Sequence, residues 1–529
     1  MSELRNKNCD KMAIITNYLI LDGIIVATMI VVTMYLYMTR NFNYWKKRGV
    51  FEIPPVPFFG NFAKCMSLKK HPGYVIRDMY GQMKEKPYMG FYLLDQPCLL
   101  LRDPEVIKDI FVKDFNYFCD RSTSPDSHDR LASSSLAFID NPAWKVLRSK
   151  LTPLFTSGKL KKMFDLMLNS ASKLDTYLES LGLEKLEGEG HTVDVKDLFG
   201  KLATDFIGSI VFGIDMKSLV DTNAEFRRRG KAIFDFKSNR TYEVLAVFFV
   251  PKIAYLAGIH FFGKKLSEQL REAFWKLIKD RIESGQKRGD LIDILLDFKE
   301  NYASDMEGYD LNGDDLVAQT MIFFTGGFET SSTAMSFALY ELAMHPEMQD
   351  KLRKEIFDAL NSSDGKITYD MVMTLPYLHM VVSEALRKYP VMPFIDRRAV
   401  KTYQLPNSDL TIKKGTRIFL SVFGLHWDPQ YFPNPEKFDP ERFSEENKSN
   451  ISAYTYLPFG KGPRMCVGPR LGLLQTKLGI MKMLCRYEVT PCEKTLIPMT
   501  LFMTASVTLP NDGELYLNIR KLKKPHIPS

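Results

Sequence analysis

The chain has 529 residues, of which 45% are hydrophobic and 25% are charged, so it can bury a large core, and its length alone suggests two or more domains. Its seven cysteines are scattered and contain no CxxC pair, which argues against a zinc site or a disulfide framework and fits a reducing compartment. The net charge of +8 suggests an acidic partner or a membrane surface and gives only weak support for nucleic-acid binding.

An apolar stretch near the N-terminus, residues 19–38, is about long enough to cross a bilayer as a helix, although Asp22 interrupts its start. The basic residues around it are Arg5, Lys7 and Lys11 before it and Arg40, Lys46, Lys47 and Arg48 after it. Because the stronger cluster follows the stretch, we expect the body of the protein to lie in the cytosol. The alternative is a cleaved signal peptide, but residues 35–38 are bulky where a small-residue cleavage site would stand.

The segments after this stretch suggest a division of the chain into an anchor at 1–40, a basic and proline-rich hinge at 41–62 and a catalytic body at 63–529. The prolines of the hinge favour an extended, stiff backbone. Residues 91–101 alternate loosely and predict a strand in a small sheet near the N-terminus, and residues 405–419 and 515–519 predict further short strands. The region 121–138 is rich in Ser and Asp and predicts a loop.

Two further patterns place donors or apolar groups at helical spacing. Trp144 and Arg148 stand at i and i+4, so an indole N–H and a guanidinium on one helix face could both donate to an anion. The alternative is a surface arginine packed on a tryptophan.

The apolar runs at 247–250 and 259–262, interrupted by Pro and Gly, are compatible with a pair of core helices.

Residues 314–344 predict a long helix that carries Gly326 and Gly327 in its middle. Two glycines there cost about 1 kcal/mol each relative to alanine, which suggests a functional reason such as room for dioxygen or a flat cofactor beside the backbone. Thr330 follows them, and its simplest role would be a hydrogen bond back to a carbonyl of its own helix. Glu384 and Arg387 lie at i and i+3 on a later helix face.

The stretch 459–468 is glycine-rich, contains Cys466, and runs into a predicted helix at 469–477. Backbone N–H groups and the helix dipole favour a thiolate at such a position, and a thiolate can bind a soft metal or attack an electrophile. A cysteine hydrolase would need a histidine partner, and the sequence near Cys466 offers none that is convincing. A buried cysteine without a ligand is the remaining alternative.

The spacing of Phe459, Gly462, Arg464, Cys466 and Gly468 resembles the haem-binding signature of the cytochrome P450 superfamily, in which the cysteine is the axial haem ligand. The motifs at 326–330, 384–387 and 438–443 follow in the family's order, so the resemblance covers nearly the whole chain, anchor included. Residues 326–341 and 426–443 look most like microsomal insect members that handle dietary toxins and insecticides. The resemblance implies a mainly α fold, with one large helical domain, small β-sheets and an N-terminal transmembrane anchor helix.

The resemblance also implies roles for individual residues. Cys466 would bind the iron of haem b, Glu329 would relay protons, and Thr330 would hydrogen-bond to the activated oxygen. A buried network of Glu384, Arg387 and Arg442 would brace the cysteine loop. The remaining haem-binding candidates are Arg464, Trp144, Arg148, Arg121, Arg397 with its neighbour Arg398 as the alternative, Phe459 and Gly468.

The implied activity is monooxygenation of lipophilic small molecules, with electrons from NADPH delivered by NADPH-cytochrome P450 reductase, and cytochrome b5 as a second candidate donor, at the cytosolic face of the endoplasmic reticulum. The segments 141–164 and 454–486 contain no acidic residue, so they could form one basic face for an acidic electron donor, or an ordinary basic surface. The family places a mobile, membrane-touching cover at 247–262. Oxidation of an endogenous hormone or lipid, a peroxide isomerase and a haem-based sensor are the alternatives.

Overall fold

The computed structural model describes residues 18–123, 128–182, 190–221, 223–237, 239–301 and 313–523. The basic residues Arg5, Lys7 and Lys11, used above to predict orientation, lie outside this range. The helices are α2 (Leu19–Thr39), α3 (Ala63–Met66), α4 (Pro72–Gln82), α5 (Pro104–Lys108), α6 (Arg130–Ser133), α7 (Ala143–Leu151), α8 (Ser157–Lys162), α9 (Phe164–Ser180), α10 (Val195–Ile207), α11 (Glu225–Ile233), α12 (Arg240–Phe249), α13 (Pro251–Leu256), α14 (Lys264–Ser284), α15 (Leu291–Asn301), α16 (Asp314–Met344), α17 (Pro346–Asn361), α18 (Tyr369–Thr374), α19 (Pro376–Lys388), α20 (Val422–His426) and α21 (Pro469–Arg486).

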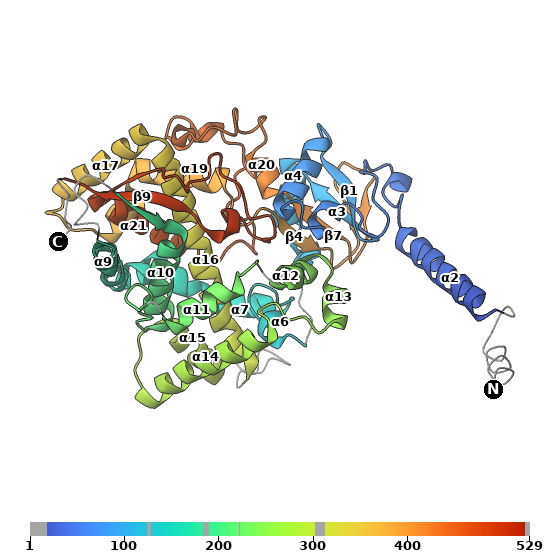
Figure 1. The fold of residues 1–529 in the computed structure, drawn as a ribbon, viewed down its shortest axis with the longest axis horizontal. Helices are drawn as coiled ribbons and strands as arrows, with labels where there is room; N and C mark the ends of the chain where they lie inside the picture. The colour runs from blue at the N-terminus through green and yellow to red at the C-terminus, as the bar shows by residue number, and fades with distance from the viewer. Residues whose placement is uncertain are drawn as a thin grey trace, which may run out of the picture.

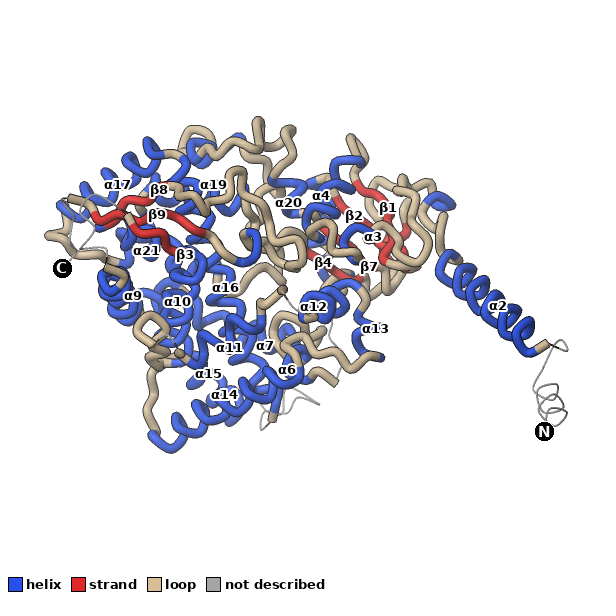
Figure 2. The backbone as a smooth tube through the Cα atoms, viewed as in Figure 1, coloured by secondary structure: helices blue, strands red, loops and turns tan. Residues whose placement is uncertain are grey.

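The strands are few and short, as the mainly α prediction expected. They are β1 (Tyr88–Leu93), β2 (Gln96–Leu101), β3 (His191–Asp194), β4 (Ile395–Arg398), β5 (Tyr403–Gln404), β6 (Thr411–Ile412), β7 (Arg417–Leu420), β8 (Tyr487–Thr490) and β9 (Tyr516–Lys521). They form a four-stranded sheet in the order β1-β2-β7-β4, a three-stranded sheet in the order β3-β9-β8, and the pair β5-β6. The larger sheet lies at the end of the body from which α2 projects, and the smaller one lies at the far end (Figure 2).

The long helix α16 runs through the middle of the helical part of the molecule (Figure 1). Its bounds, Asp314–Met344, confirm the predicted range, and nearly all of its side chains are buried. It packs against α10, α21, α6 and α19. A helix that is apolar on most of its faces must be surrounded by other elements, so α16 is the axis around which the other helices assemble.

One strand prediction was wrong. Residues 91–101 do not form a single strand but the end of β1, a turn and β2, which pair antiparallel with Leu93 opposite Gln96. Leu94 in the turn has a φ of 55°. Most side chains of both strands are buried on both faces of the sheet, so apolar alternation could not mark where one strand stopped and the next began.

Two other predictions were too coarse. The range 405–419 contains β6 and most of β7, separated by a turn in which Gly415 has a φ of 87°. The predicted loop at 121–138 contains the short helix α6, while residues 124–127 lie outside the described part of the chain. The predicted strand at 515–519 falls within β9 apart from its first residue.

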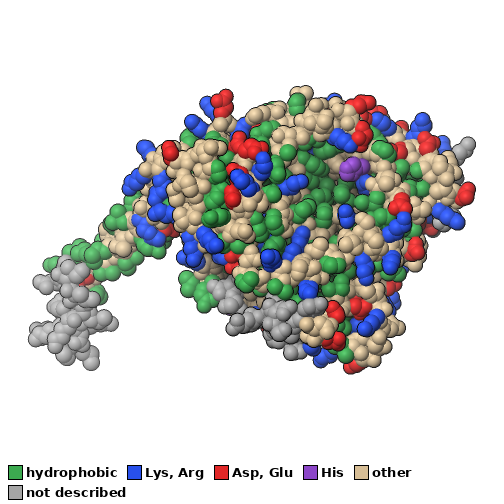
Figure 3. Space-filling view, turned by 180° about the vertical axis from the view of Figure 1, so that it is seen from behind, with side chains coloured by type: hydrophobic (Ala, Val, Ile, Leu, Met, Phe, Trp, Pro, Cys, Tyr) green, Lys and Arg blue, Asp and Glu red, His purple; other side chains and the backbone are tan. Residues whose placement is uncertain are grey.

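Helix α2 is long and apolar enough to cross a membrane, with a mean hydropathy of 2.3 over 18 residues and almost no burial against the body. This helix projects from the body and has a mostly hydrophobic surface, whereas charged side chains are scattered over the body (Figure 3). The segment that follows α2 packs against the body. The Trp45 ring lies against Gly90 of β1, where an added Cβ would come within 2.1 Å of the indole. The residues predicted as a hinge therefore lie against the larger sheet.

Candidate functional site

Cys466 lies on a tight loop that ends at the start of α21. Gly460 and Gly462 have φ values of 72° and 80°, in the left-handed region that favours glycine. The Cys466 N–H donates to the Phe459 carbonyl at 2.9 Å, which closes the loop. A Cβ on Gly462 would stand 2.0 Å from the Phe111 carbonyl oxygen, so the loop is pressed against the neighbouring chain. The backbone thus presents one thiol in one orientation.

The Cys466 side chain is solvent-exposed, yet protein atoms surround it closely enough that burial raises the pKa of the thiol. The Gly468 N–H and the positive charges of Arg148 and Arg121 act in the opposite direction. The sequence predicted a favoured thiolate, but in the protein alone burial outweighs these contributions. A cation bonded directly to the sulfur would reverse that balance, because metal coordination stabilises the thiolate.

The predicted donors on α7 lie beside this loop. Arg148 donates to the Met465 carbonyl at 2.9 Å and to the Cys466 carbonyl at 3.4 Å. Trp144 is buried, and its ring lies 4.5 Å from the Arg464 guanidinium carbon. Arg148 therefore fastens the backbone of the cysteine loop, whereas Trp144 supports Arg464.

Three buried or partly buried arginines, from three separate segments, have more donors than the protein satisfies. Arg397 is 1% exposed and Arg464 4% exposed. Among the described residues, Nε of Arg121, Arg397 and Arg464 and one terminal nitrogen of Arg464 have no hydrogen-bond partner. Burial, followed by repulsion from Arg121, lowers the pKa of Arg397 and lowers that of Arg464 to about 10. Buried donors of like charge are costly unless an anion joins them.

Acidic neighbours do not remove this surplus. Arg464 and Arg121 approach Asp120 and Asp396 only to 3.6 Å. Arg398, the alternative to Arg397, donates instead to Asp140 at 2.6 Å and lies 3.4 Å from Asp120. Of the two neighbours, Arg397 is thus the one that has no hydrogen bond to a carboxylate of the described residues, and the cluster of Arg121, Arg397 and Arg464 suits a ligand with two carboxylates. A haem, which carries two propionates, fits this set of donors next to a single thiol.

In α16 the two glycines have different surroundings. Gly326 faces open space, because no atom of the described residues lies within 4 Å of an added Cβ, whereas a Cβ on Gly327 would come within 2.2 Å of Ile207 of α10. The expectation that both glycines leave room for a ligand is therefore wrong for Gly327, which permits close helix packing. Thr330 donates to the Gly326 carbonyl at 2.6 Å, the back-bond that the sequence allowed as its simplest role.

Glu329 has a partner that sequence reasoning missed. The Lys196 ammonium, from the first turn of α10, lies 2.7 Å from the Glu329 carboxylate and 2.9 Å from the Ser332 hydroxyl. All three side chains are buried. No periodicity in the sequence links residue 196 to residue 329, so only the packing of α10 on α16 reveals the pair.

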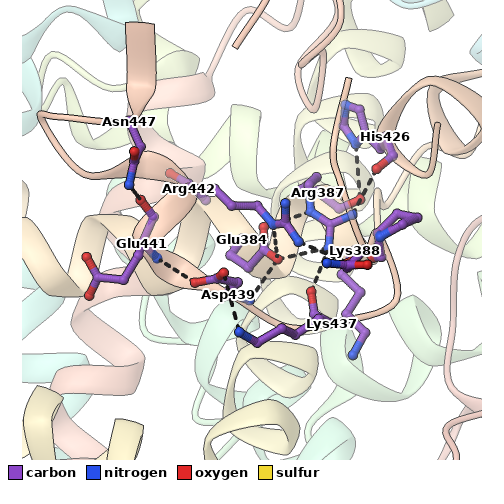
Figure 4. A network of polar contacts seen from close by, with 12 residues as sticks. Glu384, Arg387, Lys388, His426, Lys437, Asp439, Glu441, Arg442 and Asn447 are labelled. Carbon is purple, nitrogen blue, oxygen red and sulfur yellow. Dashed lines mark hydrogen bonds and ion pairs between the residues drawn. The ribbon is translucent and has the colours of Figure 1, made fainter. Parts of the chain in front are cut away.

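The structure brings Glu384, Arg387 and Arg442 together (Figure 4). Arg387 donates to both carboxylate oxygens of Glu384, at 2.7 and 2.8 Å, and Arg442 lies 3.4 Å from the same group. Arg387 also donates to the His426 carbonyl at 2.8 Å. Both Glu384 and Arg387 are fully buried, so each charge depends on the other.

His426 connects this network to the cysteine loop, and sequence reasoning gave it no role. Its Nδ1 contacts the Arg387 carbonyl at 3.2 Å, and its Nε2 accepts the Leu457 N–H at 2.8 Å, two residues before Phe459. Burial, followed by the charge of Arg387, lowers the pKa of His426 to about 3, so the ring is neutral and can accept.

The predicted basic face is smaller than the sequence suggested, because α21 is a core helix. Lys477 is 1% exposed and donates to the Met373 carbonyl, and burial lowers its pKa to about 8. Lys482 is also buried and pairs with Asp175 at 3.1 Å. Together with Arg464, these residues cannot contribute to a surface. The cations that remain exposed are Lys145, Lys159, Lys161, Lys162, Lys461 and Arg470.

The apolar segment at 247–262 is neither wholly core nor wholly surface. Val247 and Phe249 at the end of α12 are buried. The next helix, α13, exposes Ile253, Tyr255 and Leu256, the last of them to 82%. One helix therefore packs inward while its neighbour presents apolar side chains to the outside.

Comparisons with known proteins agree with this geometry. The family model described as Cytochrome P450 matches residues 52–517. Cytochrome P450 6k1 of Blattella germanica is 42% identical over 518 residues, which is 95% of this chain and 98% of the relative. Cytochrome P450 6j1 of the same insect is 40% identical over 95% of this chain and 98% of the relative, and probable cytochrome P450 6g2 of Drosophila melanogaster is 38% identical over 93% and 96%.

Proposed function

Since the chain belongs to the cytochrome P450 family and is a monooxygenase, we propose that it oxidises lipophilic foreign compounds, such as insecticides or plant toxins, at a haem bound through Cys466. Relatives of the same family in Blattella germanica and Drosophila melanogaster are 35–42% identical to it, which fits a xenobiotic-metabolising role. Oxidation of an endogenous hormone or lipid is the competing assignment, because the same apolar chemistry would serve both.

The observation that carries the proposal is the surplus of arginine donors beside one exposed thiol. Cys466 would bind the iron, while Arg121, Arg397 and Arg464 would bind the propionates. Arg148 would hold the cysteine loop, Trp144 would support Arg464, and Phe459 and Gly468 would belong to the loop that presents Cys466 to the haem. When bound, the haem supplies the activation of dioxygen; the protein supplies the ligand, the proton path and the substrate pocket.

Proton supply would fall to α16. The open space at Gly326 lets a ligand approach the helix beside the Thr330 hydroxyl. That hydroxyl gives its proton to the Gly326 carbonyl, so it can accept a hydrogen bond where it lies and can donate to a ligand only after rotating. Glu329 is held by Lys196, and we propose that it passes protons to Thr330 from this ion pair.

We further propose that α2 anchors the protein in the endoplasmic reticulum membrane with the body in the cytosol. NADPH-cytochrome P450 reductase would deliver electrons, and cytochrome b5 would be a second donor. Lys145, Lys159, Lys461 and Arg470 are exposed on segments adjoining the cysteine loop and would attract an acidic donor. No role with nucleic acid is proposed.

The test uses full-length protein in vesicles with NADPH-cytochrome P450 reductase. We expect the reduced protein to give a strongly red-shifted Soret band with carbon monoxide, and the Cys466→Ala variant to lose it. Lipophilic compounds should be screened by difference spectroscopy, and the oxidised products of those that bind should be identified.

Substrate loss should require both NADPH and the reductase, with reductase-free vesicles as the control. Turnover of a hydroperoxide without reductase would instead indicate an isomerase. Ligand binding without any turnover would indicate a sensor.

A further inference from the structure

Arg417 is a buried arginine in β7, an interior strand of the larger sheet, and is only 6% exposed. Charged residues seldom occupy such a position unless they are paired. Within the described parts of the chain, Arg417 forms no ion pair with a carboxylate. Its two terminal nitrogens donate instead to the backbone carbonyls of Phe249 and Phe248, each at 2.7 Å. The positive charge of Arg417 therefore lies against the C-terminal end of α12.

The end of α12 needs such donors. The last carbonyls of a helix have no partner within it, and the helix dipole makes that end negative. Val250 returns its N–H to the Ala246 carbonyl, and the next residue, Pro251, has no N–H to give. Arg417 supplies two donors and a positive charge at this position. Removing Arg417 would take hydrogen-bond donors from the Phe248 and Phe249 carbonyls. It would also remove the positive charge at the C-terminal end of α12.

Phe248, whose carbonyl accepts a hydrogen bond from Arg417, has its ring in a series of four packed aromatic side chains. We call this series the aromatic wall; its members are Phe138, Phe248, Phe261 and Phe394. The ring of Phe248 lies 6.0 Å from that of Phe261 and 6.5 Å from that of Phe394, and Phe261 lies 5.1 Å from Phe138. Phe249 also packs against Phe394 at 5.6 Å. The wall therefore joins α12 to the segment after α6, to the segment after α13 and to the residue before β4.

The same sheet connects this wall to the arginine cluster. Arg417 of β7 stands opposite Arg398 of β4, the strand that also carries Arg397. Asp396 of β4 accepts the backbone N–H groups of Ser122 and Thr123, at 2.6 and 2.8 Å. The Thr123 hydroxyl lies 3.5 Å from the Phe248 carbonyl. Two links, through Arg417 and through Asp396, therefore run from the sheet to the last turn of α12.

We propose that Arg417 is a positioning residue that sets the shape of the substrate pocket by fixing the end of α12, and with it the aromatic wall, to the sheet that carries Arg397. This inference rests on the proposed function, because it takes the aromatic wall as pocket lining. It assigns selectivity among lipophilic substrates partly to a residue that does not itself touch the substrate.

The test compares wild type with Arg417→Met, which keeps an extended apolar stem but removes the charge and the donors. Both are prepared as full-length, haem-loaded protein. Amide hydrogen exchange of residues 244–250 reports on the end of α12, and we expect at least about tenfold faster exchange in the variant. Spectral titration with azoles that bear alkyl chains of rising length reports on the pocket. We expect the ratio of Kd values between the longest and shortest azole to change by about tenfold.

Arg353→Met is the matched control, because Arg353 is a largely buried arginine on α17 that pairs with Asp350 away from the wall. It should leave both measurements unchanged. Arg417→Lys, which cannot reach both carbonyls with a planar fork, should fall between wild type and Arg417→Met, and it serves as the test variant should Arg417→Met not fold.

Unchanged exchange and an unchanged azole ranking in the Arg417 variants would overturn the inference. Faster exchange with an unchanged ranking would also overturn it, since Arg417 would then be only structural. Failure of the proposed function would look different, because wild type itself would show no red-shifted carbon monoxide spectrum and no response to azoles.

Discussion

Replacing Arg387 with methionine tests the buried network most directly. Glu384 is fully buried and, among the described residues, would keep only the Asp439 N–H, at 2.9 Å, and the more distant Arg442. Leaving one partner of a buried ion pair uncompensated costs about 3–5 kcal/mol. Arg387 also donates to the carbonyls of His426, Pro435 and Lys437, so we expect the upper end of that range. Since folded domains are stable by about 5–15 kcal/mol, the loss would be a large fraction of the total.

The assay is urea denaturation of haem-loaded protein, followed by circular dichroism and by the Soret band. We expect the Soret band of Arg387→Met to disappear at lower urea than the helical signal, because His426 connects the network to the cysteine loop. Arg442→Met is the control, since among the described residues Arg442 lies 3.4 Å from Glu384 and donates to one carbonyl, that of Asn434, and its loss should cost about 1 kcal/mol. The Glu384→Met/Arg387→Met double variant should be more stable than Arg387→Met, because no unpaired charge remains. A loss below about 1 kcal/mol for Arg387→Met would refute the reasoning.

Three other outcomes are expected. Gly462→Ala should abolish haem binding, because its Cβ would stand 2.0 Å from a backbone carbonyl at a φ of 80°. Gly326→Ala should keep the haem content near that of wild type, because no atom of the described residues lies within 4 Å of the added Cβ. Equal haem content in the two variants would contradict this. Thr330→Ala should retain haem but raise the ratio of NADPH consumed to product formed and release peroxide; unchanged coupling would exclude the proton role. Burial lowers the pKa of His426 to about 3 and that of His71 to about 4, so the unfolded chain binds these protons first as pH falls. Stability should therefore fall by about 2 kcal/mol per histidine between pH 7 and pH 5, and a His71→Phe variant with an undiminished loss would contradict the assignment.

Local patterns in the sequence were sufficient for several features. The apolar run at residues 19–38, the helix at 314–344 and the i, i+3 pair of Glu384 and Arg387 depend on spacing along one element. The glycine-rich loop around Cys466 was recognisable for the same reason, since its residues are contiguous. The turn between β1 and β2 was missed because both strands are buried on both faces, so the loose alternation in their sequences did not mark where one strand ended.

What the sequence by itself determined, then, was the apolar helix at 19–38, the long helix at 314–344 and the cysteine that stands ahead of a helix. Tertiary structure decided how the charges are partnered. Within the described ranges, Arg398 contacts two carboxylates while Arg397 has no hydrogen bond to one. Lys196 contacts Glu329, Lys477 is buried, and Arg417 donates to the end of α12. The physical reason is that the state of a charge depends on its burial and on its neighbours in space, and those neighbours come from segments far apart in the chain.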